Sequence, residues 1–206
     1  IYISSQPEII NGYTAAQRSY PLPDQSLMME TMLYHLRGYG VSFMDSESVL
    51  GRSSLEPSEY IFKTDTKPTT QASFIFAKAF INQLHADYQE NHDSTSDLYH
   101  LYKESNFSYT TYENILFGNI GMRSGESFTG REDLTLIIPK YETSLTYSSV
   151  LPEEESGTGS FEEVLLDLDH LEPLDPYLYS AYSVYMDGGA SYLRTITNHE
   201  QEDAPK

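Results

Sequence analysis

Residues 71–88 read QASFIFAKAFINQLHADY, and we expect the fold to be organised around them. Their apolar side chains recur at steps of three and four, which places them on one side of an α-helix: Phe74, Ala77, Ile81, Leu84 and Tyr88. Thr69 or Thr70 can cap this helix, because a threonine hydroxyl accepts a hydrogen bond from a first-turn N–H group. A helix with so many apolar turns needs a cover, so the pattern predicts a central core helix over about 71–91.

The segments around this helix alternate between helical and strand patterns. Residues 24–37 have helical spacing, and residues 110–117 begin with a capping-box pattern that predicts a short helix. Residues 134–138 and 145–150 alternate as two paired strands do. The predicted class is therefore α+β, with a mixed or antiparallel sheet packed by the 71–91 helix and several short helices.

Composition and proline placement predict one domain with an appendage at each end. Residues 1–23 contain three prolines that oppose a helix, and we expect them to form an extended N-terminal arm. Residues 24–197 are expected to form a single α+β domain, interrupted by an acidic linker near 152–160. Residues 198–206 read as a polar C-terminal tail.

Of two segments near the C-terminus, the first allows more than one structure and the second predicts a helix. Residues 161–168 follow a capping-box pattern and favour a helix that ends at Pro173, although a strand fits the same spacing nearly as well. Asp175 and Pro176 supply an N-cap and a proline at the first helical position, which predicts a helix as far as Met186.

Charge is the most informative part of the composition. The formal net charge is −19, and residues 141–193 contain eleven carboxylates but no lysine or arginine. Direct nucleic-acid binding is not expected, because phosphate contacts require clustered basic side chains. No run of eighteen apolar residues is present, so a membrane span is not expected either. The chain has no cysteine, which excludes disulfides and thiolate metal sites.

The glycine-rich segment 118–131 invites a phosphate-cradle hypothesis, with Arg123 and Arg131 as countercharges. Neither the G-x-x-x-x-G-K-[ST] nor the G-x-G-x-x-G pattern is present. Residues 125–130 are one residue too long for the G-x-S-x-G turn of a serine nucleophile. We therefore expect a mobile loop, and we expect no cofactor.

An acidic cluster near residue 170 is the densest group of ligand-type side chains. Asp167, Asp169 and Glu172 are candidate metal ligands, because Ca²⁺ and Mg²⁺ prefer carboxylate oxygens. The spacing is not that of an EF-hand loop, and Asp167 and Asp169 share a face only if the segment is a strand. A solvated acidic surface is the favoured interpretation.

Tyrosines are concentrated just after this cluster. If residues 175–186 are helical, Tyr182 and Tyr185 face inward while Tyr177 and Tyr179 stay partly exposed. Exposed tyrosine beside carboxylates is typical of protein interfaces. Our candidate partner-binding residues combine these tyrosines with acidic and arm residues: Tyr177, Tyr179, Glu162, Glu163, Ile1 and Ile3.

These observations favour a non-enzymatic structural or interaction protein, a component of a larger protein assembly such as a virus or phage particle. Its expected partners are proteins, in a homo- or hetero-oligomeric assembly. Two alternatives stay open at this point. One is an acidic inhibitor that imitates nucleic acid and occupies a basic cleft. The other is a divalent-metal-dependent hydrolase built on residues 167–175.

Overall fold

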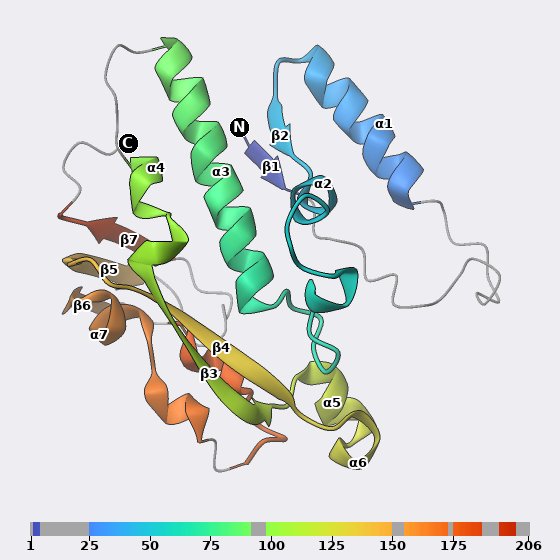
Figure 1. Cartoon of the computed structure of the whole chain (residues 1–206), viewed down its shortest axis with the longest axis vertical. Coiled ribbons are helices and arrows are strands. Elements are labelled where there is room, and N and C mark those ends of the chain that lie inside the picture. The colour runs from blue at the N-terminus through green and yellow to red at the C-terminus, as the bar shows by residue number, and fades with distance from the viewer. Residues whose placement is uncertain are drawn as a thin grey trace. The chain divides into compact units, whose positions relative to one another are not determined.

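A computed structural model describes residues 2–4, 25–91, 98–149, 155–172, 175–186 and 194–200. The chain divides into two compact units, Ile1–Tyr60 and Ile61–Lys206. Figure 1 labels the α-helices and strands of both. The sequence did not indicate a boundary at this point, and the single domain over 24–197 stays a prediction.

The Ile1–Tyr60 unit combines two short strands with helices. Strand β1 lies within the predicted N-terminal arm and pairs in parallel with β2. The prediction of a helix over 24–37 is confirmed by α1, which a left-handed Gly40 terminates, with the Val41 N–H donating to the Leu36 carbonyl over 3.1 Å. The elements are β1 (Tyr2–Ser4), α1 (Gln25–Gly38), β2 (Ser42–Met44), α2 (Ser46–Leu50) and the 3₁₀-helix η2 (Pro57–Glu59).

The Ile61–Lys206 unit contains the long helix and two antiparallel sheets, so the predicted α+β class is confirmed. One sheet is the pair β3–β4, and the other has the strand order β6–β5–β7. None of the helices in the described ranges is long and apolar enough to cross a membrane. The helices are α3 (Thr70–Asn91), α4 (Leu98–Leu101), η3 (Glu104–Asn106), α5 (Asn119–Ser124), α6 (Glu126–Thr129), α7 (Phe161–Leu165), η4 (Leu168–Leu171) and η5 (Ala181–Val184). The strands are β3 (Phe107–Leu116), β4 (Glu132–Pro139), β5 (Leu145–Ser149), β6 (Glu155–Gly159) and β7 (Arg194–Asn198).

Helix α3 confirms the prediction over 71–91, but it is not the core. The Ala72 N–H donates to the Thr69 hydroxyl over 3.2 Å, so Thr69 is the cap. Among the helix's described side chains, only Thr70 and Ala72 are buried. The buried apolar cluster comes from other elements: Phe62, Leu116, Leu134, Leu136, Leu171, Ala181 and Val184. Helix α3, which was predicted to be the core, therefore packs against the unit through half-buried side chains, and other elements form the core.

Strand β3 corrects the prediction of a helix over 110–117. It pairs with β4 from Phe107↔Pro139 to Tyr112↔Leu134, and the register shifts before Leu116. Its threonines and tyrosines are residues that suit a pleated surface. Pairing with β4 buries Leu116 completely, and this tertiary gain exceeds what a local capping box contributes to a short helix.

Strand pairing also differs from the prediction around β5. Residues 134–138 and 145–149 do lie on strands, and Val150 lies outside the described residues, but β4 pairs with β3 while β5 pairs with β6 and β7. The predicted acidic linker near 152–160 contains strand β6. Gly157 in this strand lies against Tyr147, since a Cβ atom there would sit 2.4 Å from the tyrosine ring. Glycine at this position therefore allows close packing against Tyr147.

The two C-terminal segments, 161–168 and 175–186, turn back on each other. Ser160 and Glu163 form the predicted capping box, but α7 ends at Leu165 and not at Pro173. The predicted helix over 175–186 is absent, and a turn and the 3₁₀-helix η5 replace it. Leu166 forms a bridge with Tyr185, and the Asp167 N–H donates to the Val184 carbonyl over 2.9 Å. These cross-links compete with a continuous helix.

A tight junction joins the loop before α3 to the start of α5. The Glu132 carboxylate accepts hydrogen bonds from the Lys63 and Thr64 N–H groups, at 2.9 and 2.6 Å. The Thr64 carbonyl accepts from the Ile120 and Gly121 N–H groups, and the Gly118 N–H donates to the Thr64 hydroxyl over 3.2 Å. This junction fixes the direction in which the chain leaves β3.

Substituting Gly118 should test the junction. A Cβ atom at Gly118 would lie 2.4 Å from the Asp65 Cβ and 2.5 Å from the Thr64 carbonyl oxygen. We expect Gly118→Ala to lower the free energy of unfolding by about 1–3 kcal/mol or more, as overpacking does. Urea denaturation measures this. Gly38→Ala is the control, because nothing lies within 4 Å of a Cβ atom there. Equal stability of Gly118→Ala and the wild type would contradict the junction.

The core assignment predicts a difference between two truncations. Leu134 is fully buried, so Leu134→Ala should cost about 2–5 kcal/mol. Phe80 on α3 is half-buried, and Phe80→Ala should cost less because its ring leaves less of a cavity. Urea denaturation of both variants decides the order. A larger loss of unfolding free energy for Phe80→Ala than for Leu134→Ala would show that α3 forms the core after all.

Candidate acidic surface and tyrosine pocket

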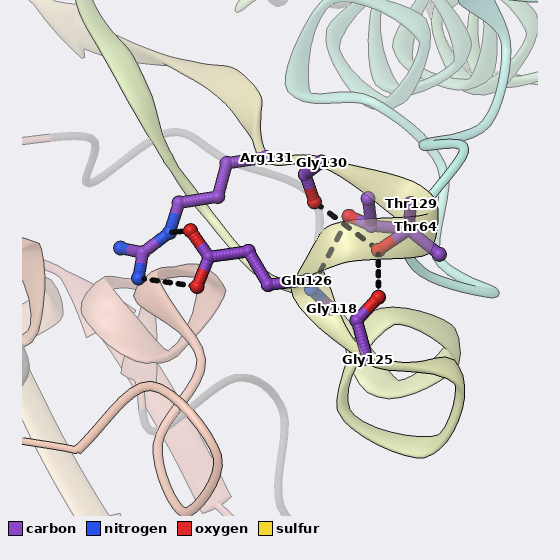
Figure 2. A network of polar contacts seen from close by, with 7 residues as sticks. All are labelled: Thr64, Gly118, Gly125, Glu126, Thr129, Gly130 and Arg131. Carbon is purple, nitrogen blue, oxygen red and sulfur yellow. Dashed lines mark hydrogen bonds and ion pairs between the residues drawn. The ribbon is translucent and has the colours of Figure 1, made fainter.

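The glycine-rich segment 118–131 is not a mobile phosphate-binding loop. It forms α5 and α6, and the amide groups at the start of α5 already donate to the Thr64 carbonyl. Figure 2 shows the Arg131 guanidinium paired with the Glu126 carboxylate, at 2.8 and 3.2 Å. This pair lowers the pKa of Glu126 and raises that of Arg131. Neither the amides nor Arg131 are therefore available to a phosphate.

The acidic cluster is used to cap a 3₁₀-helix. The Asp167 carboxylate accepts from the Asp169 N–H over 3.1 Å, and its other oxygen lies 3.1 Å from the His170 ring nitrogen. Asp169 and Glu172 are exposed on either side. Within the described ranges, no three His, Cys, Asp or Glu side chains are grouped so that they could hold a metal ion. Asp167, Asp169 and Glu172 thus gain no support as metal ligands.

Exposed apolar side chains lie beside these carboxylates. Tyr177, Leu178 and Tyr179 are 50%, 71% and 53% exposed. The His170 and Tyr179 rings are 6.4 Å apart, which connects the tyrosine turn to η4. We name the combined feature the acidic–aromatic surface, and it consists of Asp167, Leu168, Asp169, Glu172, Tyr177, Leu178 and Tyr179.

The remaining partner-binding candidates fall elsewhere. Glu162 and Glu163 are exposed on α7, but the Glu163 carboxylate accepts from the Ser160 N–H over 2.8 Å and so stabilises the helix start. That hydrogen bond lowers the pKa of Glu163. Ile3 is in β1 of the other unit, and Ile1 lies outside the described residues.

Tyr182 and Tyr185 pack inward, as the sequence predicted, although from the 3₁₀-helix η5 and the residue after it rather than from an α-helix. Together with α3, β3, β4 and β7 they line a pocket of about 450 Å³. The Tyr185 hydroxyl accepts from the Ile137 N–H over 2.8 Å. Sequence analysis missed this pocket, because its walls come from residues between 70 and 198 that share no motif.

Tyr102 and Tyr141 also line this pocket, which we name the tyrosine pocket. Burial changes the acidity of its four tyrosines. It raises the pKa of Tyr141 and of Tyr185 to about 12, from an ordinary value of 10.0. It also raises the pKa of Tyr102 and Tyr182. Near neutral pH these phenols are therefore protonated, and each can donate a hydrogen bond.

Comparison with known proteins gives no information about function, so a functional proposal depends on the geometry described above. No family model, curated protein or solved structure matches the chain.

The raised tyrosine pKa values predict a loss of stability in alkali. Below pH 10 the folded and unfolded chains both keep these protons, so this contribution does not change with pH. Between about pH 10 and 12 the unfolded chain releases protons that the folded chain retains, so stability falls as pH rises. Urea denaturation across this range measures the slope.

Tyr141→Phe should reduce that slope, because phenylalanine has no proton to release. Tyr39→Phe is the control, since Tyr39 is 84% exposed. Tyrosinate absorbance of the folded protein should show Tyr141 ionising after the exposed tyrosines. An unchanged slope in Tyr141→Phe would contradict the burial of this phenol.

Proposed function

We propose that this chain is a non-enzymatic interaction protein within a larger protein assembly. Its acidic–aromatic surface would bind a protein that presents a face rich in lysine and arginine. The observation that carries this proposal is the group of exposed side chains Tyr177, Leu178 and Tyr179 beside exposed carboxylates. Membership of a virus or phage particle stays a prediction from the sequence.

The aromatic part of this surface is held in place before binding. The Tyr177 ring packs edge-on against the buried Phe117 ring, with centroids 5.0 Å apart. An anchored ring loses little conformational entropy when a partner covers it, so more of its burial contributes to affinity. Leu178 and Tyr179 follow directly in the chain and extend the apolar area. Rigid aromatic anchors of this kind are typical of interface hot spots.

Charge supports a basic partner. Residues 141–193 contain no lysine or arginine that would offset the exposed Asp167, Asp169 and Glu172. A field of one sign steers an oppositely charged protein toward the surface and repels acidic ones. We therefore expect charge to determine the rate of association and the choice of partner, while the aromatic side chains slow dissociation.

The two alternative functions receive less support. A metal-dependent hydrolase would need Asp167, Asp169 and Glu172 to converge, but Asp167 caps η4. An acidic inhibitor that imitates nucleic acid would be expected to space its carboxylates along one rigid helix or strand. The carboxylates of the acidic–aromatic surface lie instead on the short 3₁₀-helix η4 and at its two ends.

The proposal is tested with a partner purified from its source. Immobilised protein is exposed to an extract of the source, and a retained protein is eluted by salt and purified. We expect that protein to be basic, and we expect its Kd, measured by calorimetry, to rise with salt because exposed charges are screened. The triple variant Asp169→Lys, Glu172→Lys, Tyr179→Ser should weaken binding by about tenfold or more.

Two matched variants control for charge and for apolar loss. Glu113→Lys reverses one charge at an exposed position on β3, as each of the two lysine substitutions does, and Tyr39→Ser removes an 84% exposed ring from the other unit. Both should bind as the wild type does. A partner whose Kd is insensitive to salt, or equal binding by the triple variant and the wild type, would refute this function.

A further inference from the structure

The tyrosine pocket has a wall of aromatic rings that meet edge to face. The Phe74 and Phe107 rings lie 4.7 Å apart at 69°, and the Phe107 and Tyr141 rings lie 5.8 Å apart at 84°. Tyr182 and Tyr185 form the wall contributed by η5 and the residue that follows it. The volume of about 450 Å³ is in the range of small-molecule sites. A planar aromatic molecule can extend the same edge-to-face packing.

Electrostatics restrict what this pocket can take. In the part of the chain that the structure describes, its lining includes no Asp, Glu, Lys, Arg or His side chain. An ionised ligand would lose its hydration there without gaining a countercharge, and that loss is costly. The pocket therefore selects for neutral molecules, despite the strong negative charge of the chain as a whole.

Some hydroxyl groups around the pocket are already engaged. The Thr70 hydroxyl donates to the Thr135 carbonyl over 2.6 Å, and the Tyr185 hydroxyl accepts from Ile137. In contrast, the Tyr102 and Tyr141 hydroxyls make no hydrogen bond within the described ranges. Both rings flank Phe107, at 6.1 and 5.8 Å between centroids. Two phenolic donors near each other suit a ligand with an acceptor oxygen.

From these three observations we propose that the pocket binds a neutral aromatic molecule that carries a carbonyl oxygen. The rings of the ligand pack among Phe74, Phe107 and Tyr182. Its carbonyl oxygen accepts a hydrogen bond from Tyr141, with Tyr102 as a second donor. This binding activity is separate from the acidic–aromatic surface and does not depend on it.

Three probes of similar shape separate the contributions. Benzophenone has two rings and a carbonyl, diphenylmethane lacks the carbonyl, and 2-benzoylbenzoate adds a negative charge. By calorimetry, benzophenone should bind about three- to tenfold more tightly than diphenylmethane, the effect of one hydrogen bond. The anionic probe should bind more weakly than both. No binding of benzophenone, or equal binding of the anionic probe, would overturn the proposal.

Substitutions locate the site. Ala77 lines the pocket from α3 and is exposed, so Ala77→Trp should fill the space and abolish binding without disturbing the core. Ala86→Trp places the same side chain at an exposed position on the same helix outside the pocket lining and should bind normally. Tyr141→Phe should weaken benzophenone toward the affinity of diphenylmethane, with Tyr102 left as the remaining donor, and should leave the affinity for diphenylmethane unchanged. Full affinity in Ala77→Trp would refute the site.

Photolabelling gives a readout that does not rely on substitutions. Light-excited benzophenone takes a hydrogen atom from a nearby C–H group, and the two carbon radicals join. The product is a tertiary alcohol that retains the whole mass of the probe. Peptide mass spectrometry should find the label in peptides that contain Phe74 or Tyr141, and excess diphenylmethane should reduce it. Labelling confined to other peptides would contradict the proposed pocket.

Discussion

The carbonyl of Thr64 is the point on which the Ile61–Lys206 unit depends most. It accepts the first amides of α5, while the amide of the same residue donates to Glu132 at the start of β4. One peptide segment therefore sets both the exit from β3 and the entry to β4. Because Gly118 leaves no room for a Cβ atom, the chain that leaves β3 packs directly against the backbone at Thr64. The close pairing of β3 with β4, and hence the burial of Leu116 and Leu134, follows from this contact.

Local patterns in the sequence predicted those elements whose stability is local. Helices α1 and α3 and the start of α7 carry their own periodicity and caps, and all three were expected within a few residues. Strand β3 was missed because its capping-box pattern is a local signal, whereas its pairing partner begins sixteen residues after the strand ends, at Glu132. The predicted helix after Asp175 failed for the same reason, since the bridge from Tyr185 to Leu166 is a tertiary contact. In both cases, contacts between residues distant in the sequence determined the secondary structure.

The candidate sites divide in a similar way. Sequence analysis anticipated that Tyr177 and Tyr179 are exposed while Tyr182 and Tyr185 face inward. A turn followed by a 3₁₀-helix exposes and buries the same residues here as the predicted α-helix would. Sequence analysis also anticipated the capping role of Glu163 but not that of Asp167, which caps η4. The pocket gave no signal in the sequence. Its wall joins α3 to Tyr141 and to Asn198, and only the folded chain brings these segments together.

The three-stranded sheet has a consequence for how the protein is made. Strand β5 lies between β6 and β7, and β7 follows it by more than forty residues, with α7, η4 and η5 in between. During synthesis, β5 can pair with β6 soon after both leave the ribosome, but its other edge stays open until β7 is made. Contacts of this separation slow folding, and an open strand edge is a template for aggregation. Ile196 and Asn198 complete the pocket wall only with that last strand, so a nascent chain gains the pocket after its sheet edge is closed.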